Sequence, residues 1–306
     1  MAHTNRPATH TNVFPTFLIL GAAKAGTTAL YELLSQHPQI YLPFDKEPMF
    51  FSHDENYRRG FDWYIKTYFE GAENYPARGE ATPHYLYWAE KTAARIASHI
   101  PIQDARLVII LRNPVTRAYS WYWNMVKEGK EDLPFLDALR AEPERLKHEY
   151  EKLMKNGAMT YGYLRGSDYI PQIKTFHQFF PHDHFFYMKQ EDITNLPSKP
   201  FSDLLGFLGA DADFNPVVEN VNPAALPRSK KWHQLLHGRS AAKEVIKRWL
   251  PRKFRYQLKI RLRDANLVSF SYPPIEEEAL VFLKERFSSQ IMELEQLTGL
   301  DLADWK

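Results

Sequence analysis

The chain has 306 residues, 44% of them hydrophobic and 25% charged, which is the balance of an ordinary globular protein. A formal net charge of only +2 gives no general attraction to nucleic acid, so we expect no nucleic-acid partner. The absence of cysteine excludes disulfides, thiolate catalysis and cysteine metal sites. Because no apolar run reaches about 18 residues and no signal peptide is evident, we expect a cytoplasmic location.

The N-terminal residues 1–14 are polar and lack periodicity, which predicts a disordered tail ahead of one domain spanning 15–306. The domain opens with Phe17–Leu20, an apolar run typical of a buried strand. A turn of small residues, 21–26, and an amphipathic helix follow. A strand–turn–helix of this kind directs backbone N–H groups and a helix N-terminus at one point, which attracts phosphate or a similar anion.

The turn departs from the phosphate loop of nucleoside triphosphatases at its key position. That loop reads G-x-x-x-x-G-K-[ST]. Here Gly21 and Gly26 keep the separation, but Thr27 replaces the lysine and Lys24 stands inside the loop. A decayed or coincidental loop would explain the departure, but a loop for a different anion explains it better.

The stretch resembles the 5′-phosphosulfate loop of the sulfotransferases that use 3′-phosphoadenosine 5′-phosphosulfate (PAPS). In those enzymes a lysine, a glycine and paired Ser/Thr residues follow a strand, as Lys24, Gly26, Thr27 and Thr28 do here. The resemblance implies that Lys24 is catalytic, because its ammonium would neutralise the leaving group. It also implies that the donor is bound along the whole turn, by Ala23, Lys24, Ala25, Gly26, Thr27 and Thr28.

A short predicted strand, Ile40–Leu42, leads to Lys46 and Glu47 and then to two aromatic residues, Phe50 and Phe51. This segment could be a cleft wall, or a surface loop whose aromatic residues belong to the core. It resembles the K-E-x-x-F-F motif of the heparan sulfate sulfotransferases, which implies that Glu47 is the catalytic base and that Phe50 and Phe51 contact the acceptor. Aromatic walls would raise the pKa of Glu47 and a nearby lysine would oppose this, so we expect a base competent near neutral pH.

Residues 78–85 form an extended segment that ends in a turn. The segment resembles the G-E-K-[TS]-P motif beside the acceptor in this family, which implies acceptor contacts by Thr82 and His84. Ala81 stands where some polysaccharide-modifying members carry a lysine, which argues against a heparan-like polyanionic acceptor. His84 is also the main rival of Glu47 as the base, because relatives that act on small phenols and steroids use a histidine.

Leu107–Leu111 is the clearest buried parallel strand, and Arg112 follows it directly. Asn113 and Pro114 predict the N-cap and the first position of a helix that carries Ser120. An isolated arginine here could simply end the sheet. The order of strand, R-N-P and R-A-Y-S resembles the sulfotransferase 3′-phosphate motif, which implies that Arg112 and Ser120 bind the 3′-phosphate.

Two later segments extend the resemblance to the nucleotide. Residues 163–169 are similar to the family's R-G-x-Y turn, which implies a nucleotide contact by Tyr169. Residues 222–231 form a basic loop punctuated by proline. This loop is either an exposed loop without a role or the family's loop over the nucleotide, in which case it implies contacts by Arg228, Ser229 and Lys230.

Three helical segments complete the chain. Residues 127–160 are charge-rich and predict an inserted helix pair without chemistry, and 275–297 predict a last amphipathic helix. Residues 243–263 predict a basic amphipathic helix. That helix either packs on the core with a solvated face or makes peripheral contact with an anionic surface, of the acceptor or of a membrane.

We therefore predict an α/β fold, a P-loop-like and mostly parallel sheet with helices on both faces. The function implied is transfer of a sulfuryl group from PAPS to a hydroxyl or amine of a small-molecule, lipid or carbohydrate acceptor. No metal is expected, because a lysine takes the place of the magnesium that bridges a triphosphate. The alternatives are an ATP-dependent kinase with a variant Walker loop and a non-catalytic module that binds nucleotides or polyanions.

Overall fold

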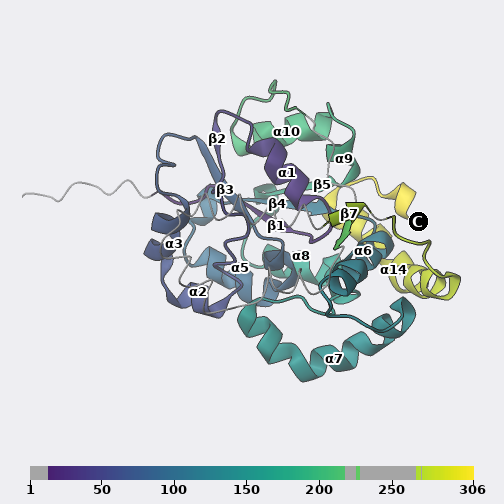
Figure 1. The fold of residues 1–306 in the computed structure, drawn as a ribbon. Helices are drawn as coiled ribbons and strands as arrows, with labels where there is room; N and C mark the ends of the chain where they lie inside the picture. The colour runs from purple at the N-terminus through teal and green to yellow at the C-terminus, as the bar shows by residue number, and fades with distance from the viewer. Residues whose placement is uncertain (1–12, 218–224, 228–266, 270) are drawn as a thin grey trace, which may run out of the picture.

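The structure, a computed structural model, describes residues 13–217, 225–227, 267–269 and 271–306. Within these ranges five parallel strands form one sheet with β1 at its centre (Figure 1). The strand order across the sheet is β2 (Ile40–Tyr41), β3 (Ala77–Ala81), β1 (Phe17–Gly21), β4 (Arg106–Leu111) and β5 (Phe185–Lys189). A second, antiparallel pair consists of β6 (Ala225–Pro227) and β7 (Leu267–Ser269). The predicted parallel α/β sheet is confirmed.

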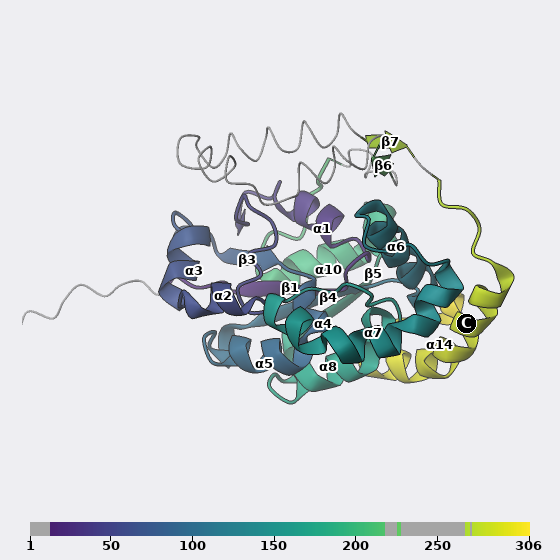
Figure 2. The same cartoon turned by 60° about the horizontal axis from the view of Figure 1, so that its bottom comes forward.

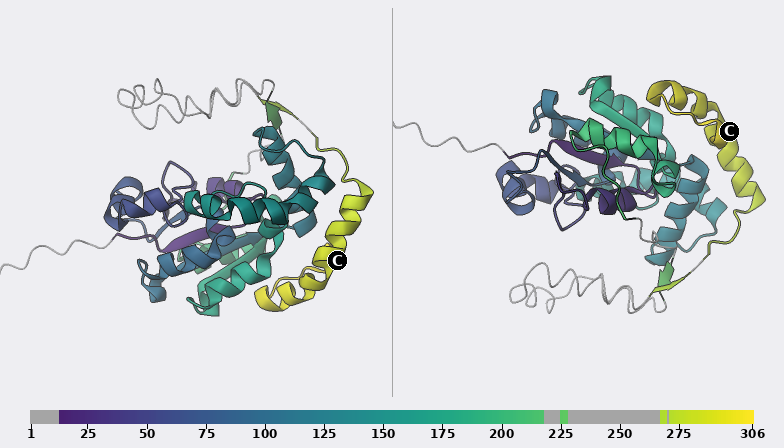
Figure 3. Two further views of the ribbon diagram at one scale, coloured as in Figure 1. Left: turned by 90° about the horizontal axis from the view of Figure 1, so that it is seen from below. Right: turned by 90° about the horizontal axis from the view of Figure 1, so that it is seen from above.

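Helices cover both faces of the sheet, as predicted. On one face lie α1 (Thr27–Leu34) and α10 (Lys199–Leu208), and on the other lie α4 (His84–Tyr87), α5 (Ala89–Ala97) and α8 (Tyr169–His177) (Figure 1 and Figure 2). The long α14 (Glu277–Thr298) runs along the outside of α6 (Pro114–Lys127) and α8 (Figure 3). No helix in the described ranges is both long enough and apolar enough to cross a bilayer. The shorter helices are α2 (Asp54–Arg58), α3 (Phe61–Tyr68) and α9 (Glu191–Thr194).

Local signals in the sequence set several helix boundaries. The Asn113 side chain accepts hydrogen bonds from the N–H groups of Val115 and Thr116, at 3.0 and 3.4 Å, and Pro114 takes the first helical position of α6. The N-terminal boundary differs from the prediction. Val13 and Phe14 already pack against the core, while the rest of the predicted tail lies outside the described residues.

The charged segment after α6 differs from the predicted helix pair. It contains one helix of 22 residues, α7 (Phe135–Asn156), with Pro143 inside it. Proline removes one backbone hydrogen bond and usually kinks or ends a helix. Buried side chains on both sides of Pro143, Leu139 and Leu153, pack into one core cluster and keep the helix continuous.

A buried arginine joins α6 to the loop that follows β1. Arg117 is fully buried, and its Nε donates to the carbonyl of Ala23 at 3.1 Å. Its Nη1 donates to the carbonyls of Gly162 and Tyr163, at 2.9 and 3.0 Å. A Cβ atom at Gly166 would lie 2.4 Å from Nη1, so a larger residue there would displace the guanidinium. Arg117 therefore fixes the loop after β1 relative to the turn before α8.

Glu142 of α7 binds the same turn from its other side. Its carboxylate accepts the N–H groups of Tyr163, Leu164 and Arg165, at 2.9, 2.6 and 2.8 Å. Burial raises the pKa of Glu142 to about 7, although these N–H donors and the charge of Arg117 oppose the shift. The carbonyl groups of the turn are thus bound by α6 and its N–H groups by α7.

Replacing Arg117 by methionine should destabilise the protein by about 3–5 kcal/mol, because it leaves buried carbonyls and the Glu142 carboxyl without their cation. The measurement is urea unfolding, with the midpoint falling at an unchanged slope. The matched control is Arg286→Met in α14, whose guanidinium is exposed and 3.4 Å from Asp168. The control should cost less than about 1 kcal/mol. Equal losses in the two variants would contradict the role assigned to Arg117.

Candidate functional site

A cavity of about 770 Å³ opens at the carboxyl edge of the sheet. The carboxyl ends of parallel strands meet at one edge, which is where ligands bind in open α/β sheets. Segments that follow β1, β3, β4 and β5 all reach this cavity. Its walls include the chemically active side chains Lys24, Thr27, Glu47, His84, Arg112 and Ser120.

The loop after β1 presents backbone N–H groups to the cavity. Lys24 and Gly26 adopt left-handed backbone conformations, with φ of 72° and 102°. Gly26 is the N-cap of α1 and supplies no side chain to bind the free N–H groups of the first turn. Thr27 and Thr28 begin the helix and both line the cavity. The uncapped N-terminus of α1 is therefore available to an anion.

Lys24 carries a positive charge that no described residue neutralises directly. Its Nζ makes no hydrogen bond or ion pair with a residue that the structure describes. Burial lowers the pKa of Lys24 to about 8, with the charges of Lys127, Arg112 and Arg117 acting in the same direction and Glu128 opposing them. An anion in the cavity would oppose this lowering of the pKa, because a nearby negative charge favours the charged ammonium.

Arg112 and Ser120 lie on the same cavity, as the sequence predicted. Arg112 Nη1 donates to the carbonyl of Lys24 at 3.2 Å, and its Nε donates to Thr116 Oγ1 at 3.0 Å. Ser120 is nearly buried and forms a side-chain hydrogen bond with Tyr272. The guanidinium is thus fixed beside the loop, while its role as a ligand of the 3′-phosphate stays a prediction.

Two residues predicted to contact the nucleotide do not reach the cavity. Ala25 is fully buried, and its N–H donates to the carbonyl of Ala22 at 3.1 Å. Tyr169 is 1% exposed, and its hydroxyl donates to the carbonyl of Arg112 at 2.8 Å. The prediction of direct contact is wrong for both, because each side chain is buried among its neighbours. Tyr169 instead holds the backbone of Arg112 through this hydrogen bond.

The predicted contacts by Arg228, Ser229 and Lys230 and the basic helix 243–263 lie outside the described residues.

Glu47 lines the cavity from the segment that follows β2. Its backbone is left-handed, with φ of 63°, and Lys46 Nζ donates to its Oε1 at 2.9 Å. His84 Nδ1 lies 3.7 Å from the other oxygen, Oε2. Burial raises the pKa of Glu47, but Lys46, His84 and Lys24 together outweigh it and the pKa is lowered. The opposing lysine that the sequence predicted is therefore present, and the positive charges together exceed the effect of burial. The role of Glu47 as a base competent near neutral pH stays a prediction.

Phe50 and Phe51 belong to the core, which was the alternative interpretation. Both are 0% exposed, and neither lines the cavity. The ring of Phe50 stacks on Tyr64 of α3, with centroids 4.5 Å apart and planes 12° apart. The prediction that these rings contact the acceptor is wrong, since they face the aromatic cluster under the loop.

Thr82 is also buried and positions the loop that carries Glu47. Its hydroxyl donates to Glu80 Oε2 at 2.7 Å and accepts the N–H of Met49 at 3.3 Å. The Tyr85 hydroxyl acts in parallel, donating to Glu80 Oε1 at 2.5 Å and accepting the N–H of Phe51 at 3.4 Å. Burial raises the pKa of Glu80 to about 7. The prediction that Thr82 contacts the acceptor is wrong, because its hydroxyl is engaged by this network.

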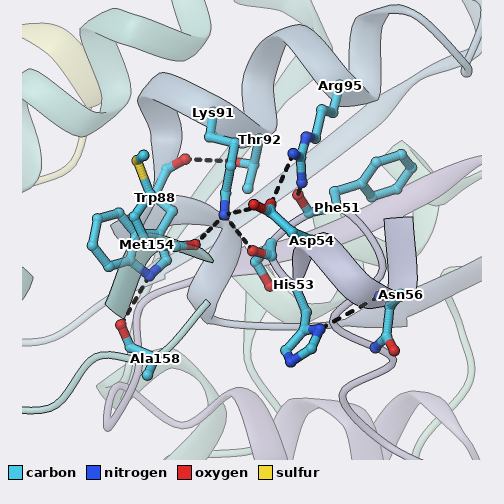
Figure 4. A network of polar contacts seen from close by, with 11 residues as sticks. Phe51, His53, Asp54, Asn56, Trp88, Lys91, Thr92, Arg95, Met154 and Ala158 are labelled. Carbon is cyan, nitrogen blue, oxygen red and sulfur yellow. Dashed lines mark hydrogen bonds and ion pairs between the residues drawn. The ribbon is translucent and has the colours of Figure 1, made fainter. Parts of the chain in front are cut away.

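A second polar network connects α5 to the end of α7 and to the residues that follow it (Figure 4). Lys91 of α5 donates to the carbonyl of Met154 near the end of α7 and lies 3.3 Å from the carboxylate of Asp54. Trp88 Nε1 donates to the carbonyl of Ala158 at 3.0 Å. These contacts fix the end of α7 and the segment that follows it, which contribute to the cavity Asn156, Ala158, Met159 and Thr160.

Several lining residues were missed by the sequence analysis. Asn124 and Glu128 follow Ser120 by four and eight residues, so helical spacing from Ser120 could have identified them. Glu128 accepts hydrogen bonds from Asn124 at 3.0 Å and from Lys130 at 2.6 Å. Tyr272 has no comparable signal. It comes from a distant segment and stacks on Trp123, with centroids 5.7 Å apart.

Comparison with known proteins identifies relatives of the whole chain. The family model described as the sulfotransferase domain matches residues 14–249. A crystal structure of a sulfotransferase from Alicyclobacillus acidocaldarius has 27% sequence identity and a TM-score of 0.68, over 96% of this chain and 99% of that one. Its likeness accords with the P-loop-like architecture of the sheet.

The curated relatives are longer proteins. The human bifunctional heparan sulfate N-deacetylase/N-sulfotransferase 3 is 26% identical over 95% of this chain and 31% of its own length. The membrane-associated sulfotransferase kil1 of Dictyostelium discoideum is 37% identical over 35% of this chain and 22% of its own length. This chain thus spans about a third or less of these relatives. Since the family model covers most of its residues, the chain belongs to the sulfotransferase-domain family.

Proposed function

We propose that this protein transfers a sulfuryl group from PAPS to a hydroxyl or amine of a small-molecule, lipid or carbohydrate acceptor. The observation that carries the proposal is the position of Lys24 in the cavity. Its ammonium lies among the charges of Lys127, Arg112 and Arg117, with no acidic partner in contact in the described residues. Such a site suits a ligand with several phosphate-like groups.

Each part of the donor has a matching group in the cavity. PAPS supplies the sulfuryl group and leaves as a 3′,5′-bisphosphate. Lys24 and the N-terminus of α1 would bind the 5′ side and neutralise the charge that develops there. Arg112 and Ser120 would bind the 3′-phosphate, since a guanidinium fork matches phosphate oxygens.

The two alternative functions fit the site less well. A kinase would need a lysine after Gly26 and an acidic residue at the end of β4, but Thr27 and Arg112 occupy these positions. A non-catalytic module would not need Glu47 and His84 beside the loop, yet both line the cavity.

The relatives and one residue of β3 bear on the class of acceptor. The names of several relatives refer to heparan sulfate, which supports a carbohydrate acceptor. Ala81 stands in β3 where some polysaccharide-modifying members of the family carry a lysine, which favours a less charged molecule. Glu47 and His84 together mark the point where the acceptor would lose its proton. The cytoplasmic location and a peripheral contact by residues 243–263 stay predictions from the sequence.

Donor identity can be tested by thermal unfolding with candidate nucleotides. PAPS and its desulfated bisphosphate should each raise the melting temperature more than ATP with magnesium does. A ligand at one hundred times its dissociation constant adds about 2.7 kcal/mol of stability. Inorganic sulfate at equal ionic strength is the control for non-specific anion effects. A larger shift with ATP and magnesium would favour the kinase alternative.

Replacing Arg112 by alanine tests whether this residue binds the 3′-phosphate in particular. The variant should bind the 3′,5′-bisphosphate about 2–3 kcal/mol more weakly, because a charged hydrogen-bond donor is lost. Binding of an analogue without the 3′-phosphate should change far less. Calorimetry measures both affinities. The matched control is Arg106→Ala, at the opposite end of β4 and away from the cavity. Equal losses for the two ligands would mean that Arg112 only supports the loop.

A further inference from the structure

The segment 271–276, which leads into α14, brings one more polar side chain to the donor side of the cavity. It carries Tyr272 followed by Pro273 and Pro274. A residue before proline favours an extended backbone, and each proline fixes its own φ. The segment is therefore stiff, and it presents Tyr272 in a defined position at a small cost in entropy.

Two aromatic residues of α6 hold this segment. Tyr119 and Trp123 are four residues apart and so lie on one side of the helix. The Tyr119 hydroxyl donates to the carbonyl of Pro273 at 2.8 Å. The ring of Tyr272 stacks on Trp123, with centroids 5.7 Å apart and planes 7° apart. These contacts use the backbone of the segment and the ring of Tyr272, and they do not need its hydroxyl.

The Tyr272 hydroxyl is instead directed at the pair predicted to bind the 3′-phosphate. Tyr272 lines the cavity together with Arg112 and Ser120, and it forms a side-chain hydrogen bond with Ser120. The sequence motif that predicted Arg112 and Ser120 does not include it. Given the proposed use of PAPS, we propose that the Tyr272 hydroxyl is a further ligand of the 3′-phosphate.

The position of Ser120 supports this assignment. Ser120 is only 4% exposed and its hydroxyl is bonded to that of Tyr272, so a phosphate that reaches Ser120 also meets Tyr272. A hydroxyl proton rotates about its C–O bond. Both hydroxyls can therefore turn their protons to phosphate oxygens while the two side chains keep their places.

The chemistry of a phosphate also calls for neutral donors beside Arg112. A phosphate monoester is close to a dianion at neutral pH and has several strong acceptor oxygens. Arg112 already uses its Nε for Thr116 and its Nη1 for the carbonyl of Lys24, so only part of its guanidinium remains for a ligand. Hydroxyl donors on the same wall would complete the set.

Tyr272 is able to donate throughout the physiological range. Burial raises the pKa of its phenol and the nearby Tyr119 acts in the same direction, while the bond to Ser120 and the charge of Arg112 oppose the rise. The phenol therefore keeps its proton at neutral pH. An ionised phenol would repel the phosphate, so the raised pKa favours binding.

Replacing Tyr272 by phenylalanine tests the hydroxyl and keeps the ring that stacks on Trp123. The variant should bind the 3′,5′-bisphosphate about 10- to 100-fold more weakly, because a hydrogen bond to a charged group is lost. Its affinity for adenosine 5′-phosphosulfate, which lacks the 3′-phosphate, should change far less. Calorimetry measures both affinities, and thermal unfolding without ligand should show a nearly wild-type melting temperature.

The matched control is Tyr119→Phe. It removes the hydrogen bond to the carbonyl of Pro273, but Tyr119 does not line the cavity. This variant should bind both ligands nearly as tightly as the wild type. Wild-type affinity of Tyr272→Phe for the bisphosphate overturns the proposal. Equal losses for the two ligands, or an equal loss in the control, also overturn it, since Tyr272 would then only hold the segment.

Phosphorus NMR of the bound bisphosphate supplies a readout that a structural role would not move. The two phosphates give separate signals. In the complex with Tyr272→Phe, the pKa of the 3′-phosphate should be higher than in the wild-type complex, because its dianion loses a donor. The 5′-phosphate should titrate as in the wild type. An unchanged 3′-phosphate, or an equal change at both phosphates, contradicts the assignment.

The wild-type protein separates this inference from the proposed function. If the wild type binds the bisphosphate no better than it binds adenosine 5′-phosphosulfate and transfers no sulfuryl group, the proposed function fails. If the wild type prefers the bisphosphate and only the Tyr272 expectations fail, the function stands. The 3′-phosphate is then bound by Arg112 and Ser120 without Tyr272.

Discussion

Positive charge concentrated around the loop after β1 is the constraint on which the site depends. Lys24 lies within the electrostatic influence of Lys127, Arg112 and Arg117, and their charges add to burial in lowering its pKa. Such a cluster is unfavourable on its own. The protein tolerates it because Nε and Nη1 of Arg117 donate to carbonyl groups and because Lys24 and Arg112 line a cavity that an anion can enter. A bound anion would neutralise the repulsion among these positive charges, which favours binding.

Two buried carboxylates hold the segments that complete the cavity. Glu80 binds hydroxyls that in turn hold the N–H groups of Met49 and Phe51, and so fixes the loop of Glu47. Glu142 binds three successive N–H groups in the turn before α8. Neither carboxylate lines the cavity. Both carboxylates hold backbone segments in place. An acidic residue next to a catalytic motif can therefore have a purely structural role.

Local patterns allowed the sheet, the phosphate loop and the position of Arg112 to be predicted. A strand followed by glycine and threonine at a helix start, or by Asn113 and Pro114, has a structure that neighbouring residues alone determine. Helical spacing would also have revealed Asn124 and Glu128. The approach of Tyr272 depends on a contact between distant segments, which no local pattern encodes.

The failed predictions concern the direction in which side chains point. Glu47 and Met49 both have left-handed backbones, so side chains along this loop do not alternate between the cavity and the core as they would along a strand. Phe50 and Phe51 are therefore both buried in the core. Thr82 directly precedes the lining residues Pro83 and His84, yet its hydroxyl forms a buried hydrogen bond, as does that of Tyr169. The pKa of Glu47 also depended on geometry, because only the structure shows that Lys46 reaches its oxygen.

The central claim is that the cavity moves a sulfuryl group from PAPS to an acceptor. The most direct measurement uses PAPS labelled in its sulfuryl group, incubated with the protein and fractionated metabolite extracts. The account predicts that label appears in an organic product, together with an equal amount of the 3′,5′-bisphosphate, and that Lys24→Met slows this transfer strongly. Label that stays in PAPS with every extract, or that is released only as inorganic sulfate, would contradict it.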